Sequence, residues 1–128
     1  MESEKDLIKY RLARASETLE DAAILAEHQK WNSCMNRLYY ACFYAVTALL
    51  LKNGFKAFTH NGVKSAFSEN FIKTGIISKE FGKTYSKLFT WRQKGDYDDL
   101  FNFTEDKVMP YFTPAKELIF AIEQEINK

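Results

Sequence analysis

The chain has 128 residues, a length that suits one hydrophobic core and is too short for two independent ones. Hydrophobic residues make up 46% and charged residues 27%, which excludes the disordered and fibrous classes of protein. With only 5 Gly and 2 Pro, the sequence lacks the turn residues that all-β sandwiches and barrels need. We therefore predict a single all-α domain over residues 1–128.

The net charge of +1 is unevenly distributed along the chain. Residues 1–30 carry five basic and seven acidic side chains, residues 31–94 ten and two, and residues 95–128 three and eight. A basic middle segment is what a phosphate-bearing partner requires, because Lys and Arg supply the non-specific part of nucleic-acid affinity. The alternative is that acidic outer helices fold against the basic middle and neutralise it, which a pI near 7.7 slightly favours.

The first two predicted helices cover residues 4–28 and 32–52. In the first, with Ser3 as its N-cap, apolar residues recur at intervals of four and three and form one narrow stripe, namely Ile8, Leu12, Ala15, Leu19, Ala22 and Ala26. The second is apolar on nearly every side and ends at Asn53-Gly54. It should be the central helix of a bundle, or lie between the bundle and a dimer partner.

Features of this central helix and of the N-terminus predict the cellular compartment of the protein. Its apolar stretch of residues 38–51 is shorter than the roughly 20 residues of a membrane span. Cys34 and Cys42 are about 12 Å apart along it, beyond disulfide reach, so they should be reduced core residues. No signal peptide is visible at the N-terminus. We expect a cytoplasmic protein without a membrane partner.

The third predicted helix covers residues 59–70, capped by Thr59, and the fourth begins after the cap Ser78. On the fourth helix Arg92 extends an apolar face, which it shares with Phe81, Tyr85 and Leu88, whereas a second row holds Lys79, Lys83 and Lys87. We expect this helix to break at Gly95 and an acidic turn to cover residues 95–99.

The last predicted helix covers residues 105–127, with Thr104 as its cap. Pro110 and Pro114 should kink its first part or delay its regular start to about Thr113. The elements add up to an all-α, up-and-down bundle of about five helices.

Several familiar kinds of catalytic site have no counterpart in this sequence. The only histidines are His28 and His60, and there is no HExxH, CxxC or paired Glu-x-x-His motif. The glycines are isolated, so no phosphate-binding loop is present, and a nucleophile elbow is also missing. We predict no metal and no cofactor.

Two polar spots stand out from apolar surroundings. Arg37 lies beside Asn36 and shares a helix face with Tyr40 and Tyr44, and Arg92 precedes Asp96 and Tyr97. One interpretation is structural: each arginine forms a buried ion pair, with Asp96 or Asp98 as acceptor, or caps carbonyl groups. The functional interpretation is a groove where the arginines hold phosphate and the tyrosines stack on bases.

Three ordered segments resemble one family. They are Asn36 to Ala45 (NRLYYACFYA), Thr59 to Val63 (THNGV) and Leu88 to Asp98 (LFTWRQKGDYD). Together they resemble the HEPN domain (higher eukaryotes and prokaryotes nucleotide-binding), in its small stand-alone prokaryotic branch with an R-x-x-x-D-Y ending. The likeness covers about residues 5–127 and implies a helical bundle that forms a homodimer with a cleft along its two-fold axis. It also implies a place in toxin–antitoxin, phage-defence or RNA-processing systems, often beside a minimal nucleotidyltransferase.

Active HEPN ribonucleases carry an arginine followed, after four to six residues, by a histidine, and they cleave RNA without a metal. Arg92 matches the arginine, but after four residues this chain has Tyr97, with aspartates at the next two positions. A phenol with a pKa of about 10 is a poor base at neutral pH. His60 could instead lean into the cleft from another helix.

The resemblance leaves three hypotheses. The first is a non-catalytic or weakly catalytic dimer that binds RNA or nucleotide and pairs with a nucleotidyltransferase. In it Arg37 and Arg92 hold phosphate, Asp96 orients Arg92, and the groove is lined by Tyr40, Tyr44 and Tyr97. The second is an active, metal-independent endoribonuclease toxin that uses Arg92 with Asp96 or Tyr97. The third is a structural dimerisation module.

Overall fold

The computed structural model describes residues 2–98 and 100–128, and within them the regular structure is entirely helical. The helices are α1 (Glu2–Glu27), α2 (Trp31–Lys52), α3 (His60–Phe67), α4 (Lys79–Tyr97), α5 (Glu105–Val108) and α6 (Phe112–Ile126). A π-helical turn, η1 (Ser68–Ile72), extends α3, and a 3-10 turn, η2 (Met109–Tyr111), joins α5 to α6. The predicted all-α bundle is confirmed.

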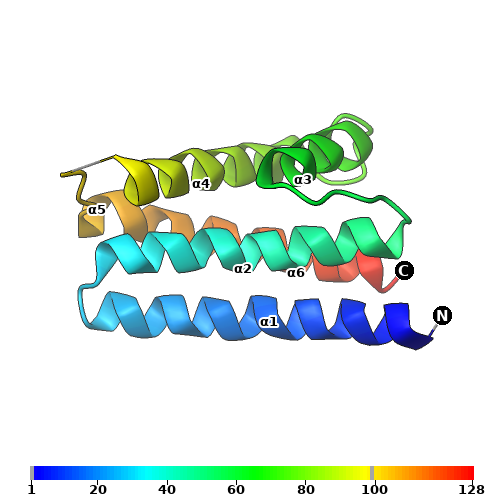
Figure 1. Ribbon diagram of the computed structural model, residues 1–128, viewed down its shortest axis with the longest axis horizontal. Helices are drawn as coiled ribbons and strands as arrows, with labels where there is room; N and C mark the ends of the chain where they lie inside the picture. The colour runs from blue at the N-terminus through cyan, green and yellow to red at the C-terminus, as the bar shows by residue number, and fades with distance from the viewer. Residues whose placement is uncertain (1, 99) are drawn as a thin grey trace.

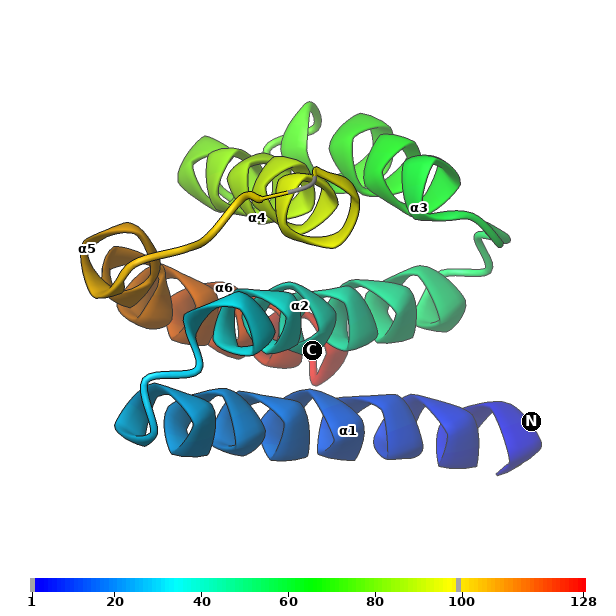
Figure 2. The same ribbon diagram turned by 60° about the vertical axis from the view of Figure 1, so that its left-hand side comes forward.

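The helices form three layers (Figures 1 and 2). In both views α1 lies along one side, α2 and α6 form the middle layer, and α4 lies on the opposite side beside α3. The N- and C-termini lie at the same end of the bundle in Figure 1, while the C-terminal end of α4 and α5 lie at the other end.

α2 is the central helix, as its apolar residues predict, because α1, α3, α4 and α6 all pack against it. Eleven of its residues are buried, and they face several sides of the helix. By length and composition alone α2 could cross a membrane, but 67% of its most apolar window is buried inside the bundle. A core helix passes the same test, and this extensive burial matches the predicted role of α2.

The apolar stripe of α1 packs against α2 as predicted. Ala15 and Ala22 are fully buried, and the four other stripe residues pack against the core. The N-cap prediction for Ser3 is wrong, because α1 already begins at Glu2. Cys34 and Cys42 are free and buried, as predicted for core thiols. Burial raises the pKa of Cys34 to about 11, so its thiol stays protonated near neutral pH.

The caps at the start of α3 and α4 are those that the sequence predicts. The Thr59 hydroxyl accepts a hydrogen bond from the Gly62 amide at 2.9 Å, and Ser78 accepts one from the Glu80 amide at 3.4 Å. Gly54, at the end of α2, has a φ of 78°, a left-handed conformation that glycine adopts without strain. These local signals fix where α3 and α4 begin and where α2 ends.

The predicted break at Gly95 is wrong, because α4 continues through Gly95 and Asp96 to Tyr97. Gly95 allows the Phe103 ring to approach α4 closely, and it does not form a turn. A Cβ atom at this position would lie 2.7 Å from Cε2 of the Phe103 ring. The helix therefore carries Asp96 one turn beyond Arg92 on the same face.

We expect Gly95→Ala to destabilise the protein by about 1–3 kcal/mol, the usual cost of overpacking a well-packed site. Alanine stabilises an ordinary helix interior relative to glycine, so the sign of the effect tests the contact with Phe103. Urea unfolding measures the change. In a Phe103→Leu background the same substitution should cost less, and an equal cost in both backgrounds would contradict this explanation.

The last helix begins in steps, as its prolines predict. Pro110 lies in the first turn of η2, and Pro114 lies in the first turn of α6, which starts at Phe112, one residue before the predicted position. Thr104 precedes α5 but makes no side-chain capping bond. On α6 the side chains of Ile119, Ile122 and Ile126 are buried in the core.

Candidate nucleotide-binding site

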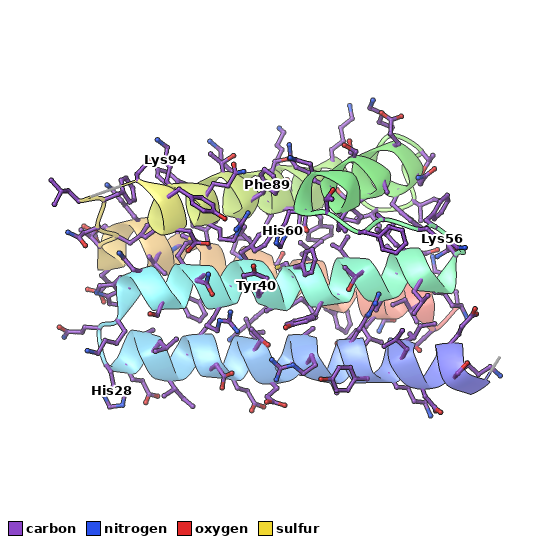
Figure 3. All side chains as sticks on the ribbon, in the orientation of Figure 1. His28, Tyr40, Lys56, His60, Phe89 and Lys94 are labelled. Atoms are coloured by element: carbon purple, nitrogen blue, oxygen red, sulfur yellow. The ribbon has the colours of Figure 1, made fainter. Side chains whose placement is uncertain are left out.

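Polar side chains from α2, α3 and α4 gather around the buried guanidinium of Arg92. We call this group the Arg92 cluster; it consists of Asn36, Tyr39, Tyr40, His60, Arg92 and Asp96. In Figure 3, Tyr40 lies on α2 and His60 lies just above it, toward α4. The cluster thus joins residues that are up to 60 positions apart in the sequence.

Arg92 is only 5% exposed, although it carries a full charge. Its Nη1 donates a hydrogen bond to Asp96 Oδ2 at 3.2 Å, and its Cζ lies 4.9 Å from the centre of the Tyr39 ring. This ion pair between Arg92 and Asp96 is the one that the structural interpretation of the sequence predicts. Its Nε is buried and, among the described residues, has no hydrogen-bond partner. A buried donor without a partner is costly, which makes this guanidinium a candidate contact for an anionic ligand.

Asp96 links Arg92 to an open groove. Its second oxygen, Oδ1, accepts a hydrogen bond from Asn36 Nδ2 at 3.4 Å. The Asn36 amide oxygen in turn accepts bonds from Arg37, at 3.1 Å from Nε and 2.7 Å from Nη2. These groups line a groove of about 450 Å³, whose residues are Leu25, Asn32, Ser33, Asn36, Arg37, Gly95 and Asp96. Arg37 therefore has a hydrogen-bond acceptor in Asn36 and lines the groove.

The tyrosines predicted to line the groove differ in their surroundings. Tyr40 is half-buried inside the cluster, and the Cζ of Arg37 lies 5.1 Å from its ring centre. Tyr44 follows on the same helix face, but the Cζ of Arg14 on α1 lies 5.3 Å from its ring centre. Tyr97, the last residue of α4, is 74% exposed. The structure thus brings together Arg37, Tyr40, Arg92 and Asp96. Tyr44 and Tyr97 lie at the edge of this group of side chains.

His60, which the sequence suggests could lean into the site from another helix, belongs to the cluster. The Tyr39 hydroxyl lies 2.8 Å from its Nδ1, and the Tyr40 hydroxyl lies 3.4 Å from its Nε2. Its position as the first residue of α3, directly after the cap Thr59, orients its ring toward α2. The available signal was the segment from Thr59 to Val63, which holds one of only two histidines.

Burial and the positive charge of Arg92 lower the pKa of His60 below its usual value of 6.5, while Asp96 opposes the shift. A neutral imidazole near pH 7 can accept a proton. The neighbouring Tyr39 hydroxyl cannot do so, because burial raises its pKa above 10.0 and keeps the phenol protonated.

The lowered pKa of His60 predicts a pH-dependent stability. As the pH falls below about 6.5, the unfolded chain takes up the proton before the folded protein does, so the folded state loses stability. We expect the Tm of His60→Gln to fall less than that of the wild type when the pH is lowered from neutral to the pKa of His60 in the folded protein. Calorimetry at a series of pH values measures both, and equal losses would contradict the lowered pKa.

The cluster combines groups that suit a phosphodiester. An arginine fork can hold two phosphate oxygens, a neutral imidazole can accept a proton, and half-buried aromatic rings can stack on a base. In the described part of the chain, no three His, Cys, Asp or Glu side chains gather as a metal site would require.

Comparison with known proteins identifies the family. The family model of the HEPN domain matches residues 8–125. A UPF0332 protein of Thermotoga maritima is 41% identical over 127 residues, which are 99% of this chain and 96% of that protein. A Methanocaldococcus jannaschii protein named "Putative toxin MJ0605" is 32% identical over 114 residues, which are 89% of this chain and 79% of that protein. The predicted resemblance is confirmed, and the chain belongs to the HEPN domain family.

Proposed function

We propose that this protein is a toxin-type HEPN protein that binds RNA or a nucleotide at the Arg92 cluster. The observation that carries the proposal is Arg92 itself, a guanidinium that is 5% exposed with a buried, unpartnered Nε. The adjoining groove at Asn36 and Arg37 gives a phosphate access to this part of the bundle. The toxin setting is supported by relatives whose names describe them as toxins.

The proposal includes two kinds of protein partner. The first is a second copy of the chain, which would enclose the groove and complete the binding cleft. The second is a nucleotidyltransferase, for which the exposed Tyr97 would be an accessible contact. Light scattering of the purified protein and co-purification with a nucleotidyltransferase encoded nearby test these two points separately.

A second candidate function is metal-independent cleavage of RNA, and the position of His60 favours it. The imidazole of His60 would accept the proton of a ribose 2′-hydroxyl as that oxygen forms a bond to the adjacent phosphorus. Arg92 would stabilise the charge on the phosphoryl oxygens. The bond from phosphorus to the 5′-oxygen then breaks, and the leaving oxygen takes a proton from solvent, while His60 later returns the proton it accepted to solvent. The products would be a 2′,3′-cyclic phosphate and a 5′-hydroxyl.

Labelled single-stranded RNA in EDTA tests both functions. Binding that weakens steeply with salt, without cleavage, supports the binding protein. Fragments with 2′,3′-cyclic phosphate ends that disappear in His60→Gln support the endoribonuclease. If the folded protein dimerises but neither binds nor cleaves RNA or nucleotide, it is a structural dimerisation module and both proposals are wrong.

A further inference from the structure

A second groove of about 690 Å³ lies between α3, η1 and α4, and it shares no lining residue with the groove beside the Arg92 cluster. Five lysines line it together with a single acidic residue, Glu69. We call it the lysine groove, and its basic residues are Lys64, Lys79, Lys83, Lys87 and Lys94. The excess of positive charge in one concave surface distinguishes it from the rest of the bundle.

Within the described residues, most of this positive charge is not neutralised by the protein. Lys64, Lys79, Lys83 and Lys87 form no ion pair there, and Glu69 is paired with Lys73 outside the groove at 2.6 Å. Lys94 has a long contact of 3.9 Å with Asp98. The ion pairs that do form join residues three or four positions apart. Acidic residues of the outer helices therefore do not neutralise the basic middle segment at this surface.

The lysines of α4 form a regular row. Lys79, Lys83 and Lys87 are exposed and follow one another at intervals of four residues, so their Cα atoms are about 6 Å apart along the helix. Such a row fits a ligand with negative charges at regular, closely spaced positions along a chain.

The floor of the groove is apolar and holds aromatic rings. Phe67 and Tyr85, each only 1% exposed, lie beneath its surface, and the partly exposed side chains of Ile72 and Trp91 form that surface. The indole of Trp91 is held by a hydrogen bond from its Nε1 to the Tyr111 hydroxyl at 3.0 Å. Gly82 keeps α4 close to η1, because a Cβ atom there would lie 2.9 Å from Cγ2 of Ile72. An apolar floor beside a cationic row suits planar bases beside phosphates better than it suits an acidic peptide.

The lysine groove adjoins the Arg92 cluster through α4. Phe89 lies between them, with Lys64 Nζ at 5.1 Å and Arg92 Cζ at 6.0 Å from its ring centre. At the C-terminal end of the helix, Lys94 and Asp96 are two residues apart. Figure 3 shows Phe89 and Lys94 along α4, with His60 beneath the helix.

We propose that the lysine groove binds single-stranded RNA along α4 and guides it to the Arg92 cluster. The phosphates contact the lysine row, and the bases face the apolar floor. This inference rests on the proposed RNA-binding function and adds the path and the strandedness of the ligand.

The test compares Lys83→Gln/Lys87→Gln with Lys5→Gln/Lys9→Gln, which removes two exposed lysines at the same spacing from α1. The probes are fluorescent oligouridylates of about 4 and about 12 nucleotides, which bracket the length of one single-strand site. The groove variant should bind the longer probe about three- to tenfold more weakly at low salt, with little change for the shorter one. Its salt slope should fall by about 1.4, since each phosphate contact contributes about 0.7. The control should match the wild type.

Failure of this inference is distinguishable from failure of the proposed function. If the wild type binds both probes and the groove variant binds each probe with the same affinity as the wild type, the lysine groove is not the path of the RNA. The proposed RNA binding at the Arg92 cluster then stands. Equal affinity for duplex RNA, or displacement of the probe by polyglutamate at equal charge, would overturn single-stranded RNA as the occupant. If the wild type binds no RNA, both proposals are wrong.

Discussion

Replacing Arg92 by methionine is expected to weaken binding of single-stranded RNA by about ten- to a hundredfold, while the protein remains folded. The affinity loss follows because a charge-assisted hydrogen bond contributes about 1.5–3 kcal/mol, and tenfold in affinity corresponds to 1.4 kcal/mol. The retained fold follows because methionine is flexible and can occupy the apolar space beside Tyr39 and Phe89.

Fluorescence anisotropy measures the affinity, and thermal unfolding measures the fold. Asp96, whose side chain is 33% exposed, can regain water when Arg92 is removed, so its loss of a partner should cost little. Arg92→Lys keeps the charge without the fork and should bind with intermediate affinity. If Arg92→Met binds RNA like the wild type, or unfolds although the space is filled, the arginine is structural and the proposed function is wrong.

Replacing Tyr39 by alanine is expected to destabilise the protein by about 3–5 kcal/mol, the range for removing a large buried aromatic ring. Tyr39 is completely buried. Its ring centre lies 5.8 Å from those of Phe43 and Tyr85 and 6.2 Å from that of Phe89, so its removal opens a cavity between α2 and α4. Urea unfolding measures the loss of stability.

Tyr39→Phe separates the ring from its hydroxyl. It retains the aromatic packing and loses the 2.8 Å hydrogen bond to His60, so we expect a cost of only about 1 kcal/mol. Tyr10→Ala provides a matched control, because Tyr10 is 59% exposed on α1 and its removal should change stability by less than about 0.5 kcal/mol. Equal costs for the alanine and phenylalanine variants at position 39 would contradict a packing role for the ring.

The parts of the structure that the sequence predicts well depend on local patterns. The all-round apolar character of residues 32–52 identifies the central helix, since a helix without a polar face must be covered on several sides. The spacing from Tyr85 to Arg92 places the arginine on the buried face of α4, and the hydroxyls of Thr59 and Ser78 mark two helix starts. Each of these signals spans only a few turns of helix.

The parts that the sequence does not predict depend on contacts between distant segments. Gly95 resembles a helix breaker until the ring of Phe103 is placed against it, because a lone glycine serves equally for a turn and for a close approach. His60 joins Arg92 only because α3 and α4 both pack against α2. No local periodicity reports that meeting, so the sequence could only suggest that His60 leans toward the site from another helix.

The central position of α2 also implies that local stability differs between this helix and the outer surface of the bundle. Amide protons of α2 should be among the slowest to exchange with solvent, since opening this helix requires the surrounding layers to separate. Tyr39 and Tyr40, which lie on this helix, therefore combine packing of the core with contacts to His60 in the Arg92 cluster. The exposed lysines of α4 have no such packing role, so substitutions there should change the charge of the lysine groove with little effect on stability.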